Sequence, residues 1–115
     1  MSITMIKGAA ALPSAQLESQ GPVRVPLGEP VAQLRSTAWR ETPDCGVWEC
    51  TPGRWERQVK SAEFCHFVAG RCTFTPAGGG AVLTIEAGDA LYFPANTRGV
   101  WDVAETVRKT YVLLE

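Results

Sequence analysis

The chain has 115 residues, a formal net charge of −1, and ordinary shares of apolar (45%) and charged (20%) residues. This length predicts one domain that can bury a core without disulfides or metals. The basic residues form no stripe, which excludes a nucleic-acid partner, and no apolar run approaches the roughly 20 residues that span a bilayer. The Gly8–Leu12 stretch is too short and too weakly apolar for a signal peptide, so we expect a cytoplasmic protein.

The cysteines indicate neither a zinc ribbon nor a disulfide framework. They are Cys45, Cys50, Cys65 and Cys72, and no C-x-x-C pair occurs among them. A structural zinc site needs closely paired cysteines. In a cytoplasmic protein we expect free thiols, which behave mainly as small buried apolar residues.

The first part of the chain lacks the periodicity of a long helix. Six prolines and glycines interrupt residues 13–30, and proline removes a backbone donor and clashes with the preceding helical turn. We predict an extended N-terminal arm over residues 1–35, with a short strand at Val23–Val25. The remaining residues, 36–115, are predicted to form a single domain.

From Gly46 onward, short apolar or alternating runs are separated by turn residues at near-regular intervals. Proline and glycine in these turns fix or free the backbone where the chain reverses. Eight short strands at such spacing predict a β-sandwich or barrel. The runs are Val47–Cys50, Trp55–Val59, Glu63–Ala69, Cys72–Thr75, Val82–Ile85, Ala90–Phe93, Val100–Val103 and Val107–Leu114. The Gly78–Gly80 triplet fits a hairpin loop and not a phosphate-binding loop, since no Lys-Ser/Thr pair or helix follows.

Two segments resemble the motifs of the cupin superfamily. Glu63–Gly70 is a glutamate followed by an apolar strand and a glycine turn, and Gly88–Gly99 opens on Gly-Asp and closes its strand with proline. With Gly46–Gly53, Trp101–Val103 and Val107–Tyr111, the set resembles the single-domain cupins grouped with (S)-ureidoglycine aminohydrolase. The resemblance implies an all-β fold, the cupin double-stranded β-helix or jelly-roll barrel, and a homodimer. We expect the arm to cross to the partner, which would cover exposed sheet edges.

The histidines that hold a metal in cupins are missing from these motifs. Counted back from Glu63, the expected His-x-His positions carry Arg57 and Val59, or Glu56 and Gln58 with a longer spacer, and the second motif has Gly99. Only Glu63 remains of the usual four ligands, and one carboxylate cannot replace an imidazole-rich set. We therefore predict no metal and no other cofactor.

Strand parity predicts which side chains face the barrel interior. Residues two apart share a face, so an inward Glu63 places Cys65 and Phe67 inside and His66 outside. For His66 a structural or surface role is therefore favoured, with a ligand or general-base role and a subunit contact as alternatives. The direction of Lys109 and Tyr111, which share a face of the last strand, is not fixed by the sequence.

The predicted pocket is aromatic, with a few polar groups, as small-molecule sites are. Its candidate ligand-binding residues are Trp48, Cys50, Trp55, Arg57, Glu63, Cys65, Trp101, Lys109 and Tyr111. We expect Glu63 to pair with Arg57 across the cavity, where the two could orient an amide, urea or carboxylate group. The competing interpretations are a structural Glu63, tryptophans that only pack the core, and a solvated Lys109.

Three functions remain open, and the residues do not decide whether the protein is an enzyme. The first is a metal-independent binder of a small polar, nitrogen-rich metabolite. The second, from the resemblance, is a hydrolase of ureido compounds with Glu63 as the catalytic residue. The third is an atypical metal site built from Glu63 with Cys50 or Cys65, because thiolates bind soft metals.

Overall fold

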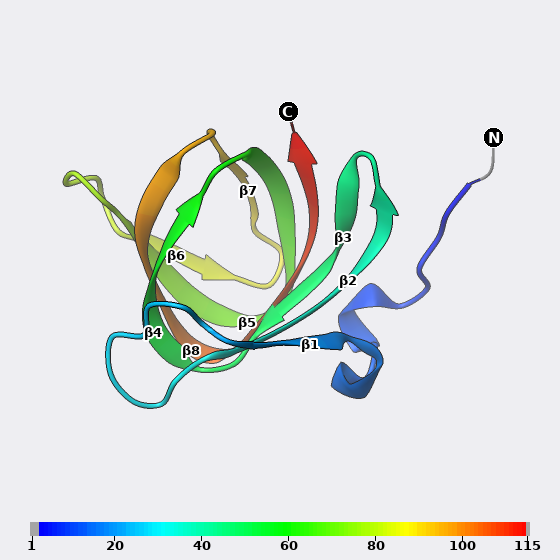
Figure 1. The fold of residues 1–115 in the computed structure, drawn as a ribbon, viewed down its shortest axis with the longest axis horizontal. Coiled ribbons are helices and arrows are strands. Elements are labelled where there is room, and N and C mark those ends of the chain that lie inside the picture. The colour runs from blue at the N-terminus through cyan, green and yellow to red at the C-terminus, as the bar shows by residue number, and fades with distance from the viewer. Residues whose placement is uncertain (1–2, 115) are drawn as a thin grey trace.

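A computed structural model describes residues 3–114, and almost all of its regular structure is β-strand. Two short 3-10 turns come first, η1 (Ala9–Ala11) and η2 (Ser14–Gln16). The strands follow as β1 (Glu18–Pro22), β2 (Gln33–Glu41), β3 (Asp44–Cys50), β4 (Gly53–Val59), β5 (Ala62–Pro76), β6 (Leu83–Glu86), β7 (Ala90–Phe93) and β8 (Thr97–Leu114). Figure 1 shows the strands curled into a barrel, as the predicted jelly-roll fold requires.

Two long strands, β5 and β8, close the barrel. The sheet order is β1-β2-β3-β8-β5-β6, while β4 also pairs with β8 and β7 also pairs with β5. The first half of β8 lies against β4 and its second half against β3, so one strand serves both sides of the barrel. The β5–β8 register shifts three times between Phe67 and Cys72, and bulges of this kind let a strand bend round a closed sheet.

The strand boundaries differ from the predicted ones in three places. Glu63–Ala69 and Cys72–Thr75 belong to one strand, and so do Val100–Val103 and Val107–Leu114. The chain before Gly46 also contributes β1 and β2, whereas the predicted strand at Val23–Val25 is absent from the structure. The arm is therefore not simply extended, and β2 runs across the expected boundary at residues 35 and 36.

The barrel interior holds the core. Its aromatic part is a chain of rings in which Trp101, fully buried, lies 4.8 Å from Phe74, 5.9 Å from Phe93 and 6.1 Å from Phe67 between centroids. Trp48 continues the chain to Trp55 at 6.4 Å and to Trp101 at 6.3 Å. Tilted ring pairs at these separations add about 0.5–1.5 kcal/mol each beyond their burial.

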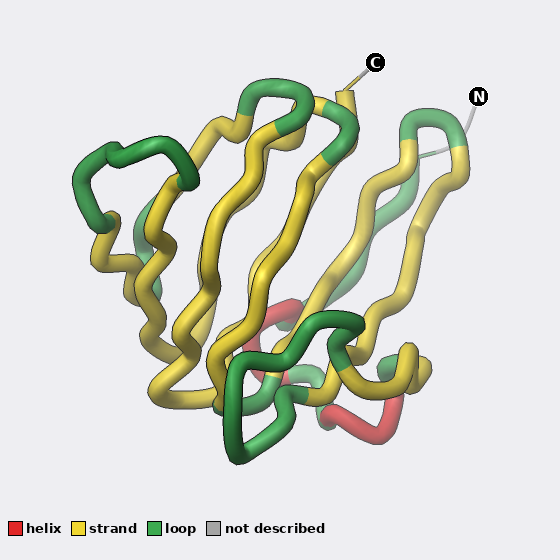
Figure 2. Tube along the Cα trace, turned by 60° about the vertical axis from the view of Figure 1, so that its left-hand side comes forward, coloured by secondary structure: helices red, strands yellow, loops and turns green. Residues whose placement is uncertain are grey.

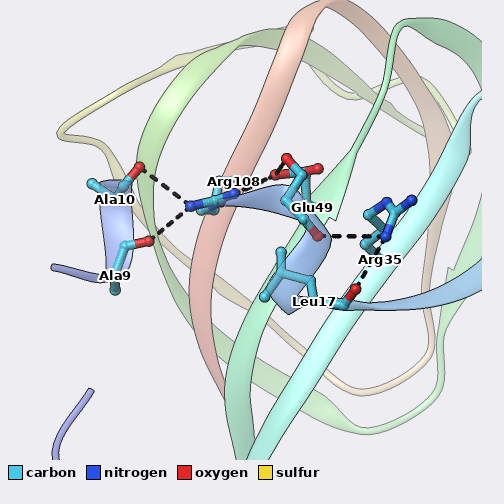
Figure 3. Close-up of polar contacts among 7 residues, drawn as sticks. Ala9, Ala10, Leu17, Arg35, Glu49 and Arg108 are labelled. Atoms are coloured by element: carbon cyan, nitrogen blue, oxygen red, sulfur yellow. Dashed lines mark hydrogen bonds and ion pairs between the residues drawn. The ribbon is translucent and has the colours of Figure 1, made fainter. Parts of the chain in front are cut away.

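The arm is fastened to the outside of its own barrel by a buried ion pair. Glu49 of β3 and Arg108 of β8 face each other in the register, 2.6 Å apart and about 5% exposed. Arg108 also donates to the carbonyls of Ala9 and Ala10, and Ser14 Oγ donates to Glu49 at 3.0 Å. Figure 3 shows Arg108 between the two sets of acceptors. Both charges are thereby desolvated by the arm that they hold.

The end of the barrel that lies away from the two 3-10 turns of the arm is formed by hairpin turns, and we call this end the rim. Figure 2 shows the hairpin turns at one end and the two 3-10 turns of the arm toward the other. The β2–β3 turn and the end of β8 both lie at this rim (Figure 1). Among residues 3–114, no helix has the length and apolar character needed to cross a bilayer.

Candidate functional site

The barrel interior contains a buried ion pair between Lys109 of β8 and Glu63 of β5. The Lys109 Nζ and Glu63 Oε2 atoms are 2.8 Å apart, and the two side chains are 3% and 2% exposed. The register places Lys109 between Trp48 on one neighbouring strand and Phe67 on the other. The last strand therefore turns its lysine inward, and Lys109 is not the solvated charge that the sequence also allowed.

Aromatic rings surround the lysine ammonium. Its Nζ atom lies 4.4 Å from the centroid of Trp48 and 5.6 Å from that of Trp101, with Phe67 and Phe93 at 5.8 and 6.0 Å. Each face of an aromatic ring is electron-rich, so a desolvated cation over it gains on the order of 2 kcal/mol.

A hollow of about 140 Å³ opens onto this pair. It is lined by Ser36, Asp44, Trp48, Arg57, Glu63, Lys109, Tyr111 and Leu113. Asp44 and Leu113 also line a wider hollow of about 480 Å³ at the rim, between the β2–β3 turn and the end of β8. A ligand entering from the rim would therefore reach Glu63 and Lys109 at the inner end.

Tyr111 and Asp44 form the polar mouth of the inner hollow. The Tyr111 hydroxyl donates to Asp44 Oδ1 at 3.1 Å. Burial, followed by the nearby Asp44 carboxylate, raises the pKa of Tyr111. The phenol therefore stays protonated at physiological pH and remains a hydrogen-bond donor at the entrance.

Arg57 lies on the aromatic wall and not against Glu63, so the expected Arg57–Glu63 pair is wrong. Its guanidinium carbon is 5.6 Å from the Trp48 centroid and 5.8 Å from that of Trp55. Within residues 3–114, no carboxylate lies within 4.0 Å of the Arg57 guanidinium, since Glu63 is paired with Lys109. The Arg57 guanidinium, which lines the hollow, is therefore available to bind an anionic group of a ligand.

Three of the cysteines are buried in the barrel. Cys50, Cys65 and Cys72 are at most 2% exposed, and all are free thiols. Desolvation by burial raises the pKa of Cys50 and Cys72 to about 12 and that of Cys65 to about 11. The nearby Lys109 ammonium opposes this rise without cancelling it. Neutral thiols are poor nucleophiles and poor metal ligands.

We expect a thiol reagent at pH 8 to modify Cys45 alone in the native protein, because Cys45 is half-buried and the other three are protonated and enclosed. Disulfide-exchange titration with and without denaturant checks this, and a Cys45→Ser variant serves as the blank.

The buried thiols also make stability depend on pH. Above pH 9.0, unfolded thiols ionise while the buried ones keep their protons. Stability should therefore fall with rising pH, by about 1.4 kcal/mol per pH unit for each buried thiol. Rapid modification of a second thiol in the native protein would contradict the conclusion that Cys50, Cys65 and Cys72 are enclosed and protonated.

The structure brings all nine predicted pocket residues together, in two layers. Five line the inner hollow directly: Trp48, Arg57, Glu63, Lys109 and Tyr111. The others form the packed core behind it: Cys50, Trp55, Cys65 and Trp101. His66 is exposed on the outer face, as parity predicted. Sequence reasoning missed Ser36, Asp44 and Leu113, and only a correct register for β2 and β3 would have found the first two.

The residues present do not fit the metal that cupins usually hold. Gly99 replaces a histidine, and a Cβ atom at that position would overlap the Phe74 ring and lie 2.5 Å from the Thr75 carbonyl oxygen. The remaining carboxylate, Glu63, already has the Lys109 ammonium as its cation. Among residues 3–114, no group of three or more His, Cys, Asp or Glu side chains is arranged to hold a metal ion.

The barrel, with β5 and β8 each pairing on both of its sides, has the cupin fold. A sequence model of the EutQ-like cupin domain matches residues 38–111. The chain therefore belongs to the EutQ-like cupin family. No curated protein sequence matches it.

Several solved structures share this fold. A DUF861-family protein of unknown function from Pseudomonas syringae pv. tomato is 27% identical, with a TM-score of 0.74 over 85% of this chain and 44% of its own. This chain thus spans less than half of that protein. A DUF861-family protein from Thermotoga maritima is 31% identical, with a TM-score of 0.58 over 61% of this chain and 78% of its own. The Clostridium difficile EutQ protein shares the fold at 18% identity, with a TM-score of 0.63 over 79% of each chain.

Proposed function

We propose that this protein binds a small, polar metabolite in the barrel without a metal. The observation that carries the proposal is the Lys109–Glu63 ion pair at the inner end of a hollow that opens at the rim. A charged pair is costly to bury, and replacing it with apolar side chains is often neutral or stabilising. A buried pair that faces a hollow is therefore better explained by what it binds than by stability.

The lining favours a ligand that both donates and accepts hydrogen bonds. Asp44 and Glu63 can accept from N–H groups, while Arg57 and Lys109 can donate to a carbonyl or carboxylate. This pattern suits a nitrogen-rich compound with an anionic end. The inner volume of about 140 Å³ is below the roughly 300–1,000 Å³ of drug-sized sites, so the ligand is a small metabolite.

Hydrolysis of ureido compounds is a second candidate, and one observation favours it. The carboxylate of Glu63 and the amine of Lys109 are in contact, so both can face one bound carbon as base and acid. An assay for ammonia release from ureido compounds, run beside the binding measurements, separates the two functions. Binding of a ureido compound without release of ammonia supports the first function, in which the protein binds a metabolite and does not hydrolyse it.

We expect small ureido, amidino and carboxylate compounds to include ligands that raise the melting temperature of the wild-type protein. A ligand that binds only the folded state adds about 2.7 kcal/mol at a concentration 100-fold above its Kd. Glu63→Gln should abolish this ligand-dependent increment. His66→Gln is the matched control, because it lies on the same strand but outside the barrel.

Two results would contradict the proposal. One is a Glu63→Gln variant that gains as much stability from the ligand as the wild type does. The other is stoichiometric zinc, manganese or iron that survives dialysis of the purified protein, measured by elemental analysis.

A further inference from the structure

We propose that Lys109 is a covalent ligand-binding residue, which forms an imine with a small 2-oxo acid. The inference rests on the proposed function, because it assigns a ligand class to the same hollow. It requires three features: an enclosed amine, a carboxylate that exchanges its proton, and a cation that holds the acid group. Each is present among the lining residues.

The amine of Lys109 is placed as a nucleophile needs to be. Its side chain is 3% exposed, yet it lines the inner hollow. In residues 3–114, Glu63 is its one carboxylate partner within 4.0 Å, and aromatic rings at 4.4–6.0 Å lie around the rest of the ammonium. Lysines that act through their neutral amines are held in such apolar, enclosed surroundings. The chain's other lysines, Lys7 and Lys60, are exposed.

Glu63 supplies the proton transfers. When the Lys109 ammonium passes a proton to Glu63 Oε2 across 2.8 Å, the amine lone pair is free to attack the carbonyl carbon. The C–N bond forms as the C=O π electrons move to oxygen, and a proton shifts from nitrogen to that oxygen to give a carbinolamine. Protonated Glu63 then returns its proton to the hydroxyl, which leaves as water while nitrogen forms the C=N bond.

The proton count and the charge balance in this sequence. One ammonium and one carbonyl compound give one protonated imine and one water, and Glu63 begins and ends as a carboxylate. The cationic imine replaces the ammonium beside the same carboxylate. The buried charge pair is therefore preserved in the adduct, which avoids the cost of leaving Glu63 unpaired.

Arg57 is the group that selects an acid among carbonyl compounds. The Arg57 guanidinium carbon and the Lys109 Nζ atom both lie within 6 Å of the Trp48 ring centroid. Because Arg57 has no carboxylate partner within residues 3–114, it can take one from the ligand. A guanidinium binds a carboxylate with two parallel hydrogen bonds. A carboxylate close to the carbonyl carbon, as in a 2-oxo acid, suits the small volume.

The test is reductive trapping with pyruvate. The whole 115-residue chain is incubated with pyruvate and cyanoborohydride, and the adducts are counted by intact mass and located by peptide mapping. We expect one adduct per chain on Lys109, with Lys7 and Lys60 as internal controls at background. Lys109→Arg, which keeps the buried charge, should give no adduct above that background. Glu63→Gln should trap about 100-fold more slowly, since it cannot carry the proton.

Acetaldehyde, which lacks a carboxylate, isolates the role of Arg57. Arg57→Gln should weaken pyruvate trapping roughly tenfold and leave acetaldehyde trapping unchanged. A rise in melting temperature with pyruvate, without reductant, reports binding separately. Stabilisation with no adduct, or with adducts spread equally over the three lysines, would overturn the imine and leave the proposed function standing. If pyruvate neither stabilises nor traps, the 2-oxo acid assignment is wrong, and the wider ligand panel decides the proposed function.

Discussion

Lys109→Met is expected to lower the free energy of unfolding by about 3–5 kcal/mol, which is the usual cost of removing one partner of a buried ion pair. The variant leaves Glu63, 2% exposed, without its cation in a barrel lined by aromatic rings. It also removes the cation from above Trp48. Urea denaturation followed by circular dichroism measures the loss.

The double variant Lys109→Met/Glu63→Leu separates charge from packing. Both charges are then gone and similar volumes remain, so we expect most of the lost stability to return. Lys60→Met is the surface control and should change stability by less than about 0.5 kcal/mol. A double variant as unstable as Lys109→Met would show that the packing of the two side chains, and not their charge, stabilises the barrel.

Arg108→Met should also cost about 3–5 kcal/mol, through the other buried pair. Of its side-chain partners among residues 3–114, Glu49 would keep only the hydroxyl of Ser14, and the carbonyls of Ala9 and Ala10 would lose the Arg108 donor. We therefore expect faster amide hydrogen exchange over η1 and η2 together with the global loss of stability. Hydrogen exchange by mass spectrometry resolves the two effects.

Arg71→Met is the matched control for Arg108→Met. Arg71 also pairs with a glutamate across β5 and β8, but the two side chains are 56% and 62% exposed. Exposed pairs contribute about 0–1 kcal/mol because water screens them. Equal losses in the two variants would mean that the arm does not desolvate the Glu49–Arg108 pair.

Turn chemistry predicted the barrel well and its strand lengths poorly. Ala90–Phe93 is bounded by Gly88-Asp89 and Pro94, and the structure has that strand as predicted. At Gly70 the same kind of signal marks a bulge inside β5, where φ is 83° and the register shifts. A glycine that ends a strand and one that bends it look alike in sequence, because both supply a positive φ.

The strand β2 was missed because its sequence is mostly polar. Gln33–Glu41 has an intermediate or exposed side chain at every position, so it lacks the alternation that marks a half-buried strand. It forms because β1 and β3 pair with it on either side. Such pairing comes from distant parts of the chain and leaves no local signal.

Strand parity correctly predicted that Glu63 faces the barrel interior, but it was not used to give the direction of Lys109, the partner of Glu63 in the ion pair. It placed Glu63, Cys65 and Phe67 inside and His66 outside correctly, since β5 is regular there. For β8 the predicted strands Val100–Val103 and Val107–Leu114 were counted separately, so the inward direction of Trp101 was not carried over to Lys109. In the structure the two segments are one strand, and Trp101, Val107 and Lys109, which are an even number of residues apart, are all buried.

The central position of β8 has a consequence for how the chain folds as it is made. β3, β4 and β5 each need β8 as a neighbour, and β8 follows all of them in the sequence. Until its residues leave the ribosome, which adds about 5–20 residues per second, their edges remain open. The N-terminal arm also cannot pack until then, because Arg108, which donates a hydrogen bond to the Ala9 carbonyl, lies 99 residues after Ala9. The barrel therefore closes only after the last strand is synthesised, and the earlier strands need protection from aggregation until then.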